Sequence, residues 1–351
     1  MQEYSPFKIV HHIDKLQELK DKHQTVPLQI HIVPSNVCNQ RCSFCAYRMK
    51  DFPSNERFVE KDILSYEKIR EILLSAADMG VKAIQFTGGG EPLVHPHILD
   101  IFKDTLSNNL DLALVSNGQA LTTEICEILG EAKWVRISID SGSPELYSLI
   151  RNVSSKIFYK VLDNIRTLIK YRKDSIIGIG FVVQRENYRE IYKCAKISKD
   201  LGVNNFRISS AFTPMKYKYF SSFVDEAREL SKKAEDLSDD NFTVFNLFND
   251  RIRDNFEGVQ DYDFCPIKEL QTFIGADYNV YTCCTLAYNN RGLIGSIKDQ
   301  TFEELWNSRE KTDMFSRHSP KNICKLPCLY KGKNDFINYC ISDNPKHGNF
   351  I

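Results

Sequence analysis

Hydrophobic and polar residues follow two different periods along this chain, and the two kinds of segment alternate. Apolar residues at every second position predict strands, whereas apolar stripes with the helical period predict helices between them. Strand–helix units of this kind predict an α/β fold with a parallel sheet, either doubly wound or curved into an incomplete barrel. The six predicted strands are Leu28–Val33, Lys82–Thr87, Asp111–Ser116, Trp134–Ile139, Ile176–Val183 and Asn205–Ser210.

Local signals mark where several of the predicted helices begin. Ser65 is a suitable N-cap for a helix over Tyr66–Met79. Asn187 and Glu190 have the spacing of a capping box at the start of Tyr188–Leu201. Further helices are predicted over Ile13–Lys20, Ile157–Arg172, Asp225–Leu237 and Phe302–Ser308.

The alternation within the strands favours the barrel. Strands covered by helices on both faces are apolar throughout, but here residues such as Ile30 and Ile32 alternate with small or polar ones. We expect these second-face residues to line a ligand-filled lumen. If they instead lie near strand ends, they meet water. The residues concerned are Gln29, His31, Arg136, Ser138, Gly178, Gly180, Arg207 and Ser209.

Charge and composition narrow the function classes. Lys plus Arg and Asp plus Glu both number 46, a balance that argues against a dedicated nucleic-acid or anionic-membrane surface. No apolar run is long enough to span a bilayer, and Met1–Pro6 lacks the features of a secretory signal, so we expect a cytoplasmic protein. Eleven cysteines in such a chain indicate metal or redox chemistry rather than disulfides.

Cys38, Cys42 and Cys45 form a C-x3-C-x2-C pattern directly after the first predicted strand. Three thiolates on one short loop can converge on a soft metal centre. A 4Fe–4S cluster held in this way keeps one iron open, whereas a structural zinc site usually has four protein ligands. The pattern therefore favours an iron–sulfur cluster, with zinc as the alternative.

A glycine-rich segment, residues 88–92 with the sequence GGGEP, follows the second predicted strand. Glycines at a strand end let the backbone approach a ligand closely, and the carboxylate of Glu91 can accept a hydrogen bond from an ammonium group. A glycine-rich turn before a helix is common by itself. In this order after a cysteine triad, however, the two motifs together are specific.

On these two motifs the sequence resembles the radical S-adenosylmethionine superfamily over about residues 28–210, which implies a partial (β/α)6 TIM-like barrel. The resemblance implies that Cys38, Cys42 and Cys45 ligate a 4Fe–4S cluster whose open iron chelates S-adenosylmethionine (AdoMet). It also implies that residues matching the family's cofactor-binding positions contact AdoMet. These are Phe44 near the adenine, Gly88, Gly89, Gly90 and Glu91 near the methionine amino group, and Ser116, Asn117, Ser138, Asp140 and Arg151 near the ribose, carboxylate or sulfonium.

The resemblance further implies the reaction. An electron from a low-potential donor, such as flavodoxin or ferredoxin, cleaves AdoMet reductively to methionine and a 5′-deoxyadenosyl radical, which abstracts hydrogen from a substrate C–H bond. Because the radical must be oriented and shielded from solvent, a barrel closed by a cap suits it. The cofactor carries the difficult step, and the protein positions it.

The tail of the chain contains six further cysteines. A predicted β-hairpin over Phe273–Tyr281, with Asp277 and Asn279 suited to its turn, separates the second of them from the first. This tail resembles the SPASM and twitch extensions of radical AdoMet enzymes, which hold auxiliary 4Fe–4S clusters. The six are Cys265, Cys283, Cys284, Cys324, Cys328 and Cys340.

Six cysteines are fewer than a two-cluster SPASM domain usually uses, so the resemblance favours the twitch arrangement with one auxiliary cluster. Its expected ligands are Cys265, Cys283, Cys324 and Cys328. Cys284 lies next to Cys283 in an apparently extended run, so we expect the two side chains to point apart. Cys284 in place of Cys283, or Cys340, remain possible ligands. Cys340 is alternatively a catalytic thiol near the substrate or a bystander, and the whole tail site is alternatively a structural zinc site.

These patterns divide the chain into an N-terminal helical segment over residues 1–27, a radical AdoMet core over 28–240 and an α+β SPASM/twitch domain over 241–351. The expected function is hydrogen abstraction that oxidises, epimerises or rearranges a small molecule or sugar-derived substrate. One alternative is a peptide maturase that forms a cross-link or epimer. Another is a zinc-stabilised, non-catalytic binding protein.

Overall fold

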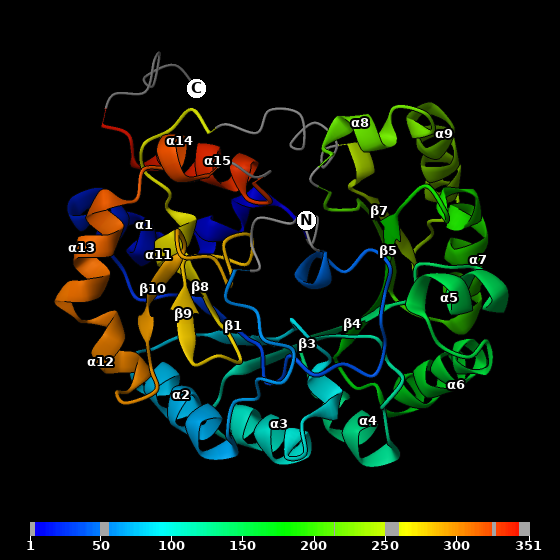
Figure 1. Ribbon diagram of the computed structural model, residues 1–351, viewed down its shortest axis with the longest axis horizontal. Helices are drawn as coiled ribbons and strands as arrows, with labels where there is room; N and C mark the ends of the chain where they lie inside the picture. Colours follow the sequence, from blue (N-terminus) through cyan, green and yellow to red (C-terminus); the bar gives the residue numbers. More distant parts are fainter. Residues whose placement is uncertain (1–3, 50–55, 214, 250–259, 325–327, 344–351) are drawn as a thin grey trace.

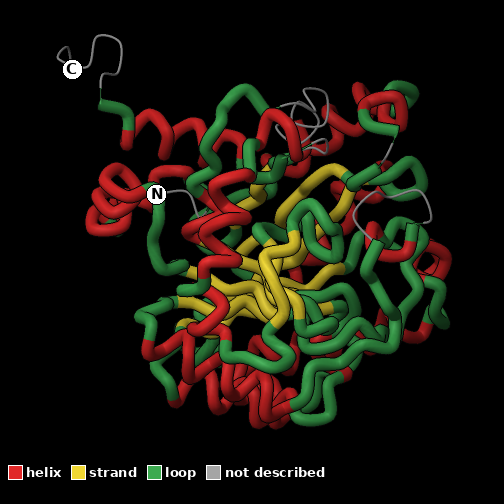
Figure 2. The backbone as a smooth tube through the Cα atoms, turned by 60° about the vertical axis from the view of Figure 1, so that its left-hand side comes forward, coloured by secondary structure: helices red, strands yellow, loops and turns green. Residues whose placement is uncertain are grey.

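The computed structural model describes residues 4–49, 56–213, 215–249, 260–324 and 328–343. Within these ranges one continuous sheet has the strand order β10-β9-β8-β1-β2-β3-β4-β5-β6-β7. The strands from β8 through β1 to β7 are parallel neighbours, and β9 and β10 are added antiparallel at the β8 edge. The sheet curves, with helices on its outer side, so the predicted partial barrel is confirmed (Figures 1 and 2).

The strands are short and follow the predicted positions closely. Their bounds are β1 (Gln29–Ile32), β2 (Ala83–Phe86), β3 (Asp111–Ser116), β4 (Trp134–Ser138), β5 (Ile176–Val183), β6 (Asn205–Ser210), β7 (Thr243–Asn246), β8 (Gln271–Ile274), β9 (Asn279–Tyr281) and β10 (Leu293–Ser296).

The longer outer helices each bury one apolar stripe, and side-chain caps start two of them, α2 and α4. In α2, the Ser65 side chain accepts a hydrogen bond from the Lys68 N–H, and Ile69, Ile72 and Leu73 are buried against the sheet. The outer helices are α2 (Tyr66–Asp78), α3 (Ile98–Ser107), α4 (Thr123–Leu129), α5 (Pro144–Arg151), α6 (Lys156–Tyr171), α7 (Ile191–Leu201), α8 (Tyr217–Phe220) and α9 (Val224–Glu235).

The remaining helical elements belong to the two ends of the chain and to short turns. They are η1 (Pro6–His11), α1 (Ile13–Lys22), η2 (Ala46–Arg48), η3 (Pro92–Val94), η4 (Tyr188–Glu190), α11 (Ile267–Leu270), α12 (Phe302–Trp306), α13 (Arg309–Arg317), α14 (Pro320–Ile323) and α15 (Lys331–Ile341).

Two local expectations differ from the structure. Strand β7 extends the parallel sheet just beyond residue 240, and a four-residue strand carries too little alternation to be recognised. The capping box at Asn187 is wrong, because α7 begins only at Ile191. The Asn187 amide instead donates to the carbonyls of Asp140 and Val182, so a tertiary contact takes the side chain away from the helix.

The N-terminal residues span the side on which the barrel is incomplete. The ring of Tyr4 lies 4.9 Å from that of Phe245 in β7, and the ring of Phe7 lies 4.8 Å from that of Phe336 in α15. Figure 1 shows the N-terminus between the two edges of the curved sheet. A separate apolar cluster, which includes Leu19, fixes this segment to α11 and α15.

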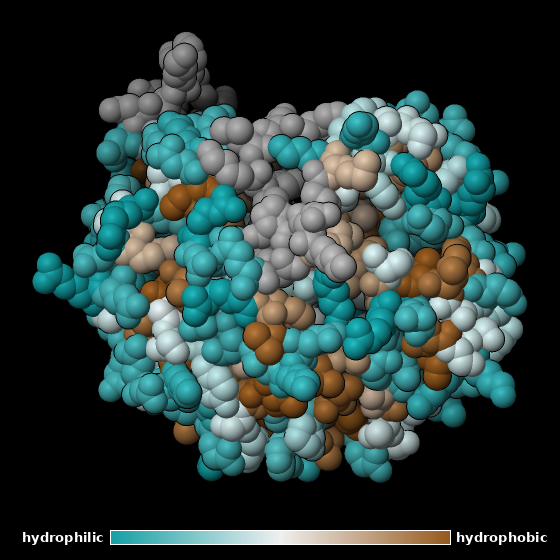
Figure 3. Space-filling model, in the orientation of Figure 1, coloured by the Kyte–Doolittle hydropathy of each residue, from teal (hydrophilic) through white to brown (hydrophobic). Residues whose placement is uncertain are grey.

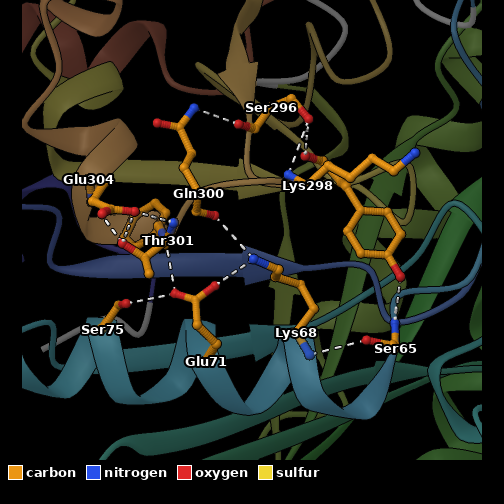
Figure 4. A network of polar contacts seen from close by, with 11 residues as sticks. Ser65, Lys68, Glu71, Ser75, Ser296, Lys298, Gln300, Thr301 and Glu304 are labelled. Carbon is orange, nitrogen blue, oxygen red and sulfur yellow. Dashed lines mark hydrogen bonds and ion pairs between the residues drawn. The ribbon is translucent and has the colours of Figure 1, made fainter.

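The tail is anchored to the barrel in two ways. Strand β8 continues the sheet beside β1, and a polar network joins α2 to the loop before α12 (Figure 4). In that network Lys68 Nζ contacts Glu71 at 2.9 Å and donates to the carbonyl of Gln300, while the Phe302 N–H donates to Glu71. The tail and the barrel therefore form one packed body.

Alternate residues of the strands face inward, as the sequence predicts. Ile30 and Ile32 lie in the core with the outer helices, whereas the intervening His31 lies on the lumen face in register with Gln85 of β2 and Phe273 of β8. The face of the molecule seen in Figure 3 is largely hydrophilic, with groups of apolar residues between polar ones. No helix in the described part of the chain combines the length and apolarity that a membrane crossing requires.

Substitution of the buried His31 by glutamine is expected to make the protein less sensitive to acid. Burial, together with the charges of Arg136 and Lys333, lowers the pKa of His31 to about 3. The unfolded state therefore binds a proton below about pH 6.5 that the folded state does not, and stability falls as the pH drops from there towards 3. The anaerobic urea midpoint, measured from pH 7.5 to 5.5, should decline less steeply in His31→Gln.

The matched control for this measurement is His11→Gln, at an exposed position near the N-terminus. Identical slopes for His31→Gln and His11→Gln would contradict the assignment of this acid sensitivity to the buried imidazole.

Candidate functional site

The loop that carries Cys38, Cys42 and Cys45 leaves the carboxyl end of β1 and is held by neighbouring segments. The Arg41 N–H donates to the carbonyl of Arg151, and the Ser43 N–H donates to the carbonyl of Ile150, both at the end of α5. All three cysteine side chains are half-buried. The loop thus presents its thiols at the end of the barrel where the strands terminate.

Each of the three thiols receives a nitrogen donor from a different segment. Asn117 Nδ2 lies 4.0 Å from Cys38 Sγ, Arg151 Nη1 lies 3.4 Å from Cys42 Sγ, and Arg48 Nη1 lies 3.9 Å from Cys45 Sγ. Such donors favour the deprotonated sulfur and tune a cluster that it ligates.

Burial makes the thiols of Cys38 and Cys45 harder to deprotonate, because it raises their pKa values. Burial raises the pKa of Cys38 to about 11, and burial also raises the pKa of Cys45. Sulfur must be deprotonated to ligate a metal, and the charge of the metal stabilises the thiolate that burial disfavours. This donor set of three soft ligands with N–H donors fits an iron–sulfur cluster with an open position.

The glycine segment after β2 lies directly against the cysteine loop. The Gly90 N–H donates to the carbonyl of Ser35 at 3.2 Å, and the Glu91 N–H donates to the carbonyl of Val37 at 2.9 Å. A Cβ atom at Gly90 would lie 2.2 Å from the Val37 carbonyl oxygen, and one at Gly89 would lie 2.5 Å from Asn36 Oδ1. Only glycine permits this approach.

Gly90→Ala is therefore expected to separate the two segments and to weaken AdoMet binding by about tenfold, at a strain cost of about 1–3 kcal/mol. Equilibrium dialysis of the reconstituted protein with AdoMet measures the effect. The control is Gly332→Ala in α15, where an added Cβ meets no atom within 4 Å. Unchanged AdoMet affinity in Gly90→Ala would show that the segments need not touch.

The structure brings Glu91, Ser116 and Asn117 together. The buried carboxylate of Glu91 accepts hydrogen bonds from Ser116 Oγ at 2.7 Å, the Asn117 N–H at 2.8 Å and the Leu93 N–H at 3.1 Å. A carboxylate has about four acceptor positions, so one is left for a ligand ammonium group. Glu91 therefore links the end of β2 to the end of β3. The sequence motif did not reveal this structural role.

Asp140 and Arg151 form a buried ion pair beside Cys42. Burial alone would lower the pKa of Arg151, but the Asp140 carboxylate offsets this and raises it. The guanidinium also lies 5.5 Å from the centre of the Phe44 ring. Phe44, Asp140 and Arg151, which were predicted from separate motifs, therefore lie close together. Ser138 lies nearby on the lumen face of β4.

The expected auxiliary ligands also converge. Burial raises the pKa of Cys265 to about 12 and of Cys328 to about 11. Burial, followed by the nearby thiols of Cys284, Cys324, Cys328 and Cys265, raises the pKa of Cys283 well above its ordinary value. Four thiols therefore lie near that of Cys283, although no group of three or more His, Cys, Asp or Glu side chains in the described residues is arranged to hold a metal ion as it stands.

The premise that Cys283 and Cys284 lie in an extended run is wrong, whereas the prediction that their side chains point apart stays a prediction. Strand β9 ends at Tyr281, so Cys283 and Cys284 lie in a turn, where the alternation of an extended strand does not apply. The Cys284 thiol lies 3.3 Å from Tyr330 Oη and acts on Cys328. Cys340, by contrast, is exposed on α15.

Sequence reasoning missed several residues around the cysteines, because a position two or three residues from a cysteine does not show that a side chain lies near the thiols. Arg48 and Tyr47 follow Cys45, and the pKa of Tyr47 is raised by burial and then by the thiols of Cys284, Cys45 and Cys283. Tyr47 thus lies between the two groups of cysteines. In the tail, Lys268 is buried near Cys265 and Cys324. Only the position of Arg48 shortly after the cysteine triad gave any signal.

Two family models match this chain. One is described as the radical SAM superfamily and matches residues 32–197. The other, SPASM, is described as an iron–sulfur cluster-binding domain and matches residues 265–329. The first contains the cysteine triad and the glycine segment, and the second contains the converging tail cysteines but ends before Cys340.

Similar proteins are known over most of the chain. A tungsten-containing aldehyde ferredoxin oxidoreductase cofactor-modifying protein of Pyrococcus furiosus is 28% identical over 83% of this chain and 83% of its own length. An AdoMet-dependent heme synthase of Methanosarcina barkeri is 25% identical over 78% and 80%. The fold is similar to that of Streptococcus suis SuiB bound to AdoMet, with a TM-score of 0.65 and 15% identity over 98% of this chain and 82% of SuiB.

Proposed function

Since this chain belongs to the radical SAM superfamily and carries a SPASM domain, we propose that it is a cytoplasmic oxidoreductase-type enzyme that abstracts hydrogen from a small-molecule substrate. When bound, a reduced 4Fe–4S cluster and AdoMet would supply a 5′-deoxyadenosyl radical for this step. The observation that carries the proposal is the triad of Cys38, Cys42 and Cys45, each with its own N–H donor, pressed against the glycine segment.

The chain's own residues would bind and orient the cofactor. Gly88, Gly89 and Gly90 bring backbone close to the cysteine loop, and Glu91 keeps one acceptor position for the methionine ammonium group. Arg151 would face the carboxylate or sulfonium region from beside Cys42. The catalytic unit, in this proposal, runs from residue 28 through residue 240, and β7 adds one further parallel strand just beyond it.

We assign one auxiliary 4Fe–4S cluster to the tail, held by Cys265, Cys283, Cys324 and Cys328. Their convergence supports this assignment. A second redox centre can accept an electron from the substrate after hydrogen abstraction, which supports an oxidation as the outcome. Flavodoxin or ferredoxin would supply the low-potential electron. The iron content of a variant that lacks the cysteine triad tests the tail cluster separately from the first.

A small molecule is the favoured substrate because the relatives that share most of this chain's length are named for cofactor modification and heme synthesis. A peptide is the second candidate, since SuiB, of similar fold, has been solved with its precursor peptide SuiA. In the part of the chain that the structure describes, residues 4–22 pack along the open side of the barrel rather than forming a separate peptide-binding module.

Anaerobic reconstitution with iron and sulfide tests the enzyme assignment. We expect about eight iron atoms per chain, as for two 4Fe–4S clusters, and release of 5′-deoxyadenosine on reduction. Binding of zinc instead, with AdoMet left intact, would favour the non-catalytic alternative.

A label-transfer experiment then distinguishes the two substrate classes. The reduced enzyme is incubated with AdoMet and an extract of cells grown in deuterated medium, and deuterium in 5′-deoxyadenosine is measured. Prior digestion of the extract with a broad protease should leave the transfer intact if the substrate is a small molecule. Loss of transfer after digestion would favour a peptide.

A further inference from the structure

A tyrosine of the tail reaches the loop that leads from β1 to the cysteine triad. Tyr288 lies in a turn between β9 and β10 and is fully buried, and its hydroxyl donates to Asn36 Oδ1 at 2.6 Å. The same hydroxyl accepts a hydrogen bond from the Ala276 N–H at 3.1 Å. Since Asn36 is also fully buried, this bond joins the tail to the barrel without competition from water.

The glycine segment packs against Asn36. A Cβ atom at Gly89 would lie 2.5 Å from Asn36 Oδ1, and one at Gly90 would lie 2.4 Å from the Asn36 carbonyl carbon. The oxygen that accepts the Tyr288 hydroxyl is therefore the same oxygen that limits how closely Gly89 approaches. A different position of the Asn36 side chain would change the space in which the glycine segment lies.

The segment over residues 57–59 completes a closed set of contacts around this bond. Asn36 Nδ2 donates to the carbonyl of Val59 at 2.9 Å, and the Arg57 N–H donates to the carbonyl of Tyr288 at 2.9 Å. Between these two residues, the ring of Phe58 lies 5.2 Å from the ring of Tyr288. Both polar groups of the Asn36 amide are thus used, and the amide is held in one orientation.

Asn36 is also linked to the cysteine triad. Its carbonyl accepts a hydrogen bond from Arg48 Nη2 at 3.3 Å, and Nη1 of the same guanidinium lies 3.9 Å from Cys45 Sγ. The tail, the glycine segment and the arginine beside Cys45 therefore all contact this one residue.

We propose that Tyr288 is a positioning residue for the AdoMet site. Its hydroxyl fixes the side chain of Asn36, and Asn36 holds the glycine segment at the spacing that binds AdoMet. A binding site is tighter when the residues that form it are already held in place before the ligand arrives. The tail thus sets the affinity of the barrel for AdoMet through one hydrogen bond. The inference deepens the proposed function and rests on it for the identity of the ligand.

Tyr288→Phe tests the inference, because it removes the hydroxyl and keeps the ring. Hydrogen–deuterium exchange is measured in the reconstituted protein without AdoMet, in peptides that cover residues 88–92. We expect faster exchange there, because the N–H groups of Gly90 and Glu91 donate to the loop that carries Asn36. In equilibrium dialysis, AdoMet affinity should fall by about fivefold, as for the loss of one hydrogen bond.

Tyr281→Phe is the matched control. The hydroxyl of Tyr281 lies in the same aromatic cluster of the tail but donates to Asp277 at 2.6 Å. Because a bond to a carboxylate is lost, the urea midpoint should fall at least as far as in Tyr288→Phe. Exchange of residues 88–92 and AdoMet affinity should nevertheless match the parent, whereas a merely structural role would give the two variants the same result.

A second variant tests the route through Asn36. In protein that already carries Asn36→Ala, the further change Tyr288→Phe should alter neither the exchange of residues 88–92 nor AdoMet affinity. Additive effects of the two substitutions would overturn the inference.

Unchanged exchange in Tyr288→Phe, faster exchange with unchanged AdoMet affinity, or equal effects in Tyr281→Phe would also overturn the inference. Failure of the parent to bind AdoMet would refute the proposed function instead. In that case, faster exchange in Tyr288→Phe alone would still support the positioning of the glycine segment, because that measurement needs no ligand.

Discussion

Replacement of Cys38, Cys42 and Cys45 together by alanine is expected to abolish the release of 5′-deoxyadenosine. It should also lower the iron content from about eight atoms per chain to about four, because the tail cysteines would keep their own cluster. Tyr47 lies near thiols of both groups, and burial followed by those of Cys284, Cys45 and Cys283 raises its pKa. Iron analysis and anaerobic product assay of the reconstituted variant measure both effects.

The control for the triple variant is Cys126→Ala, which removes a thiol buried in the core between α4 and the sheet. It should retain the parent's iron content and product release. Complete loss of iron from the triple variant would refute a separate tail cluster, and retained AdoMet cleavage would refute the role of the triad.

Arg151→Met is expected to destabilise the protein by about 3–5 kcal/mol, because it leaves the Asp140 carboxylate buried without its partner. The side chains of Arg151 and Asp140 are only 5% and 1% exposed, so water cannot replace the lost charge. The same variant removes the donor to Cys42 and should lose AdoMet binding as well. The anaerobic urea midpoint and equilibrium dialysis measure the two consequences.

A double variant, Asp140→Leu with Arg151→Met, separates the two effects. It removes both charges and should regain much of the stability while AdoMet binding stays lost. Arg166→Met is the surface control, since its ion pair with Asp163 is exposed and worth at most about 1 kcal/mol. A similar loss of stability in Arg151→Met and Arg166→Met would show that burial of the pair is unimportant.

The sequence predicts the barrel well because its strands obey a simple rule. Ile30, Ile179 and Ile208 face the helices, and the residues between them face the lumen, as alternation requires. The prediction of a capping box at Asn187 is wrong because, unlike the strands, this residue does not follow a local pattern. Its local signal is outweighed by hydrogen bonds to Asp140 and Val182, which no local pattern encodes.

At the cysteine sites, too, local patterns could be predicted from the sequence and nonlocal contacts could not. The spacing of Cys38, Cys42 and Cys45 predicts the ligands of the first cluster, but the N–H donors near their thiols could not be predicted. Asn117 and Arg151 reach the thiols only because the strands bring their loops to one end of the barrel. Likewise, the extended run expected at Cys283 and Cys284 is absent, because β9 ends at Tyr281 and a turn follows.

The contacts of η1 bear on how this protein is made. The segment that spans the open side of the barrel is synthesised early, whereas its partner α15 emerges from the ribosome late. Phe7 and Leu19 therefore cannot form their native contacts while most of the chain is translated. The contact that spans the barrel's open side therefore pairs an early segment with a late one and forms only after both have been synthesised.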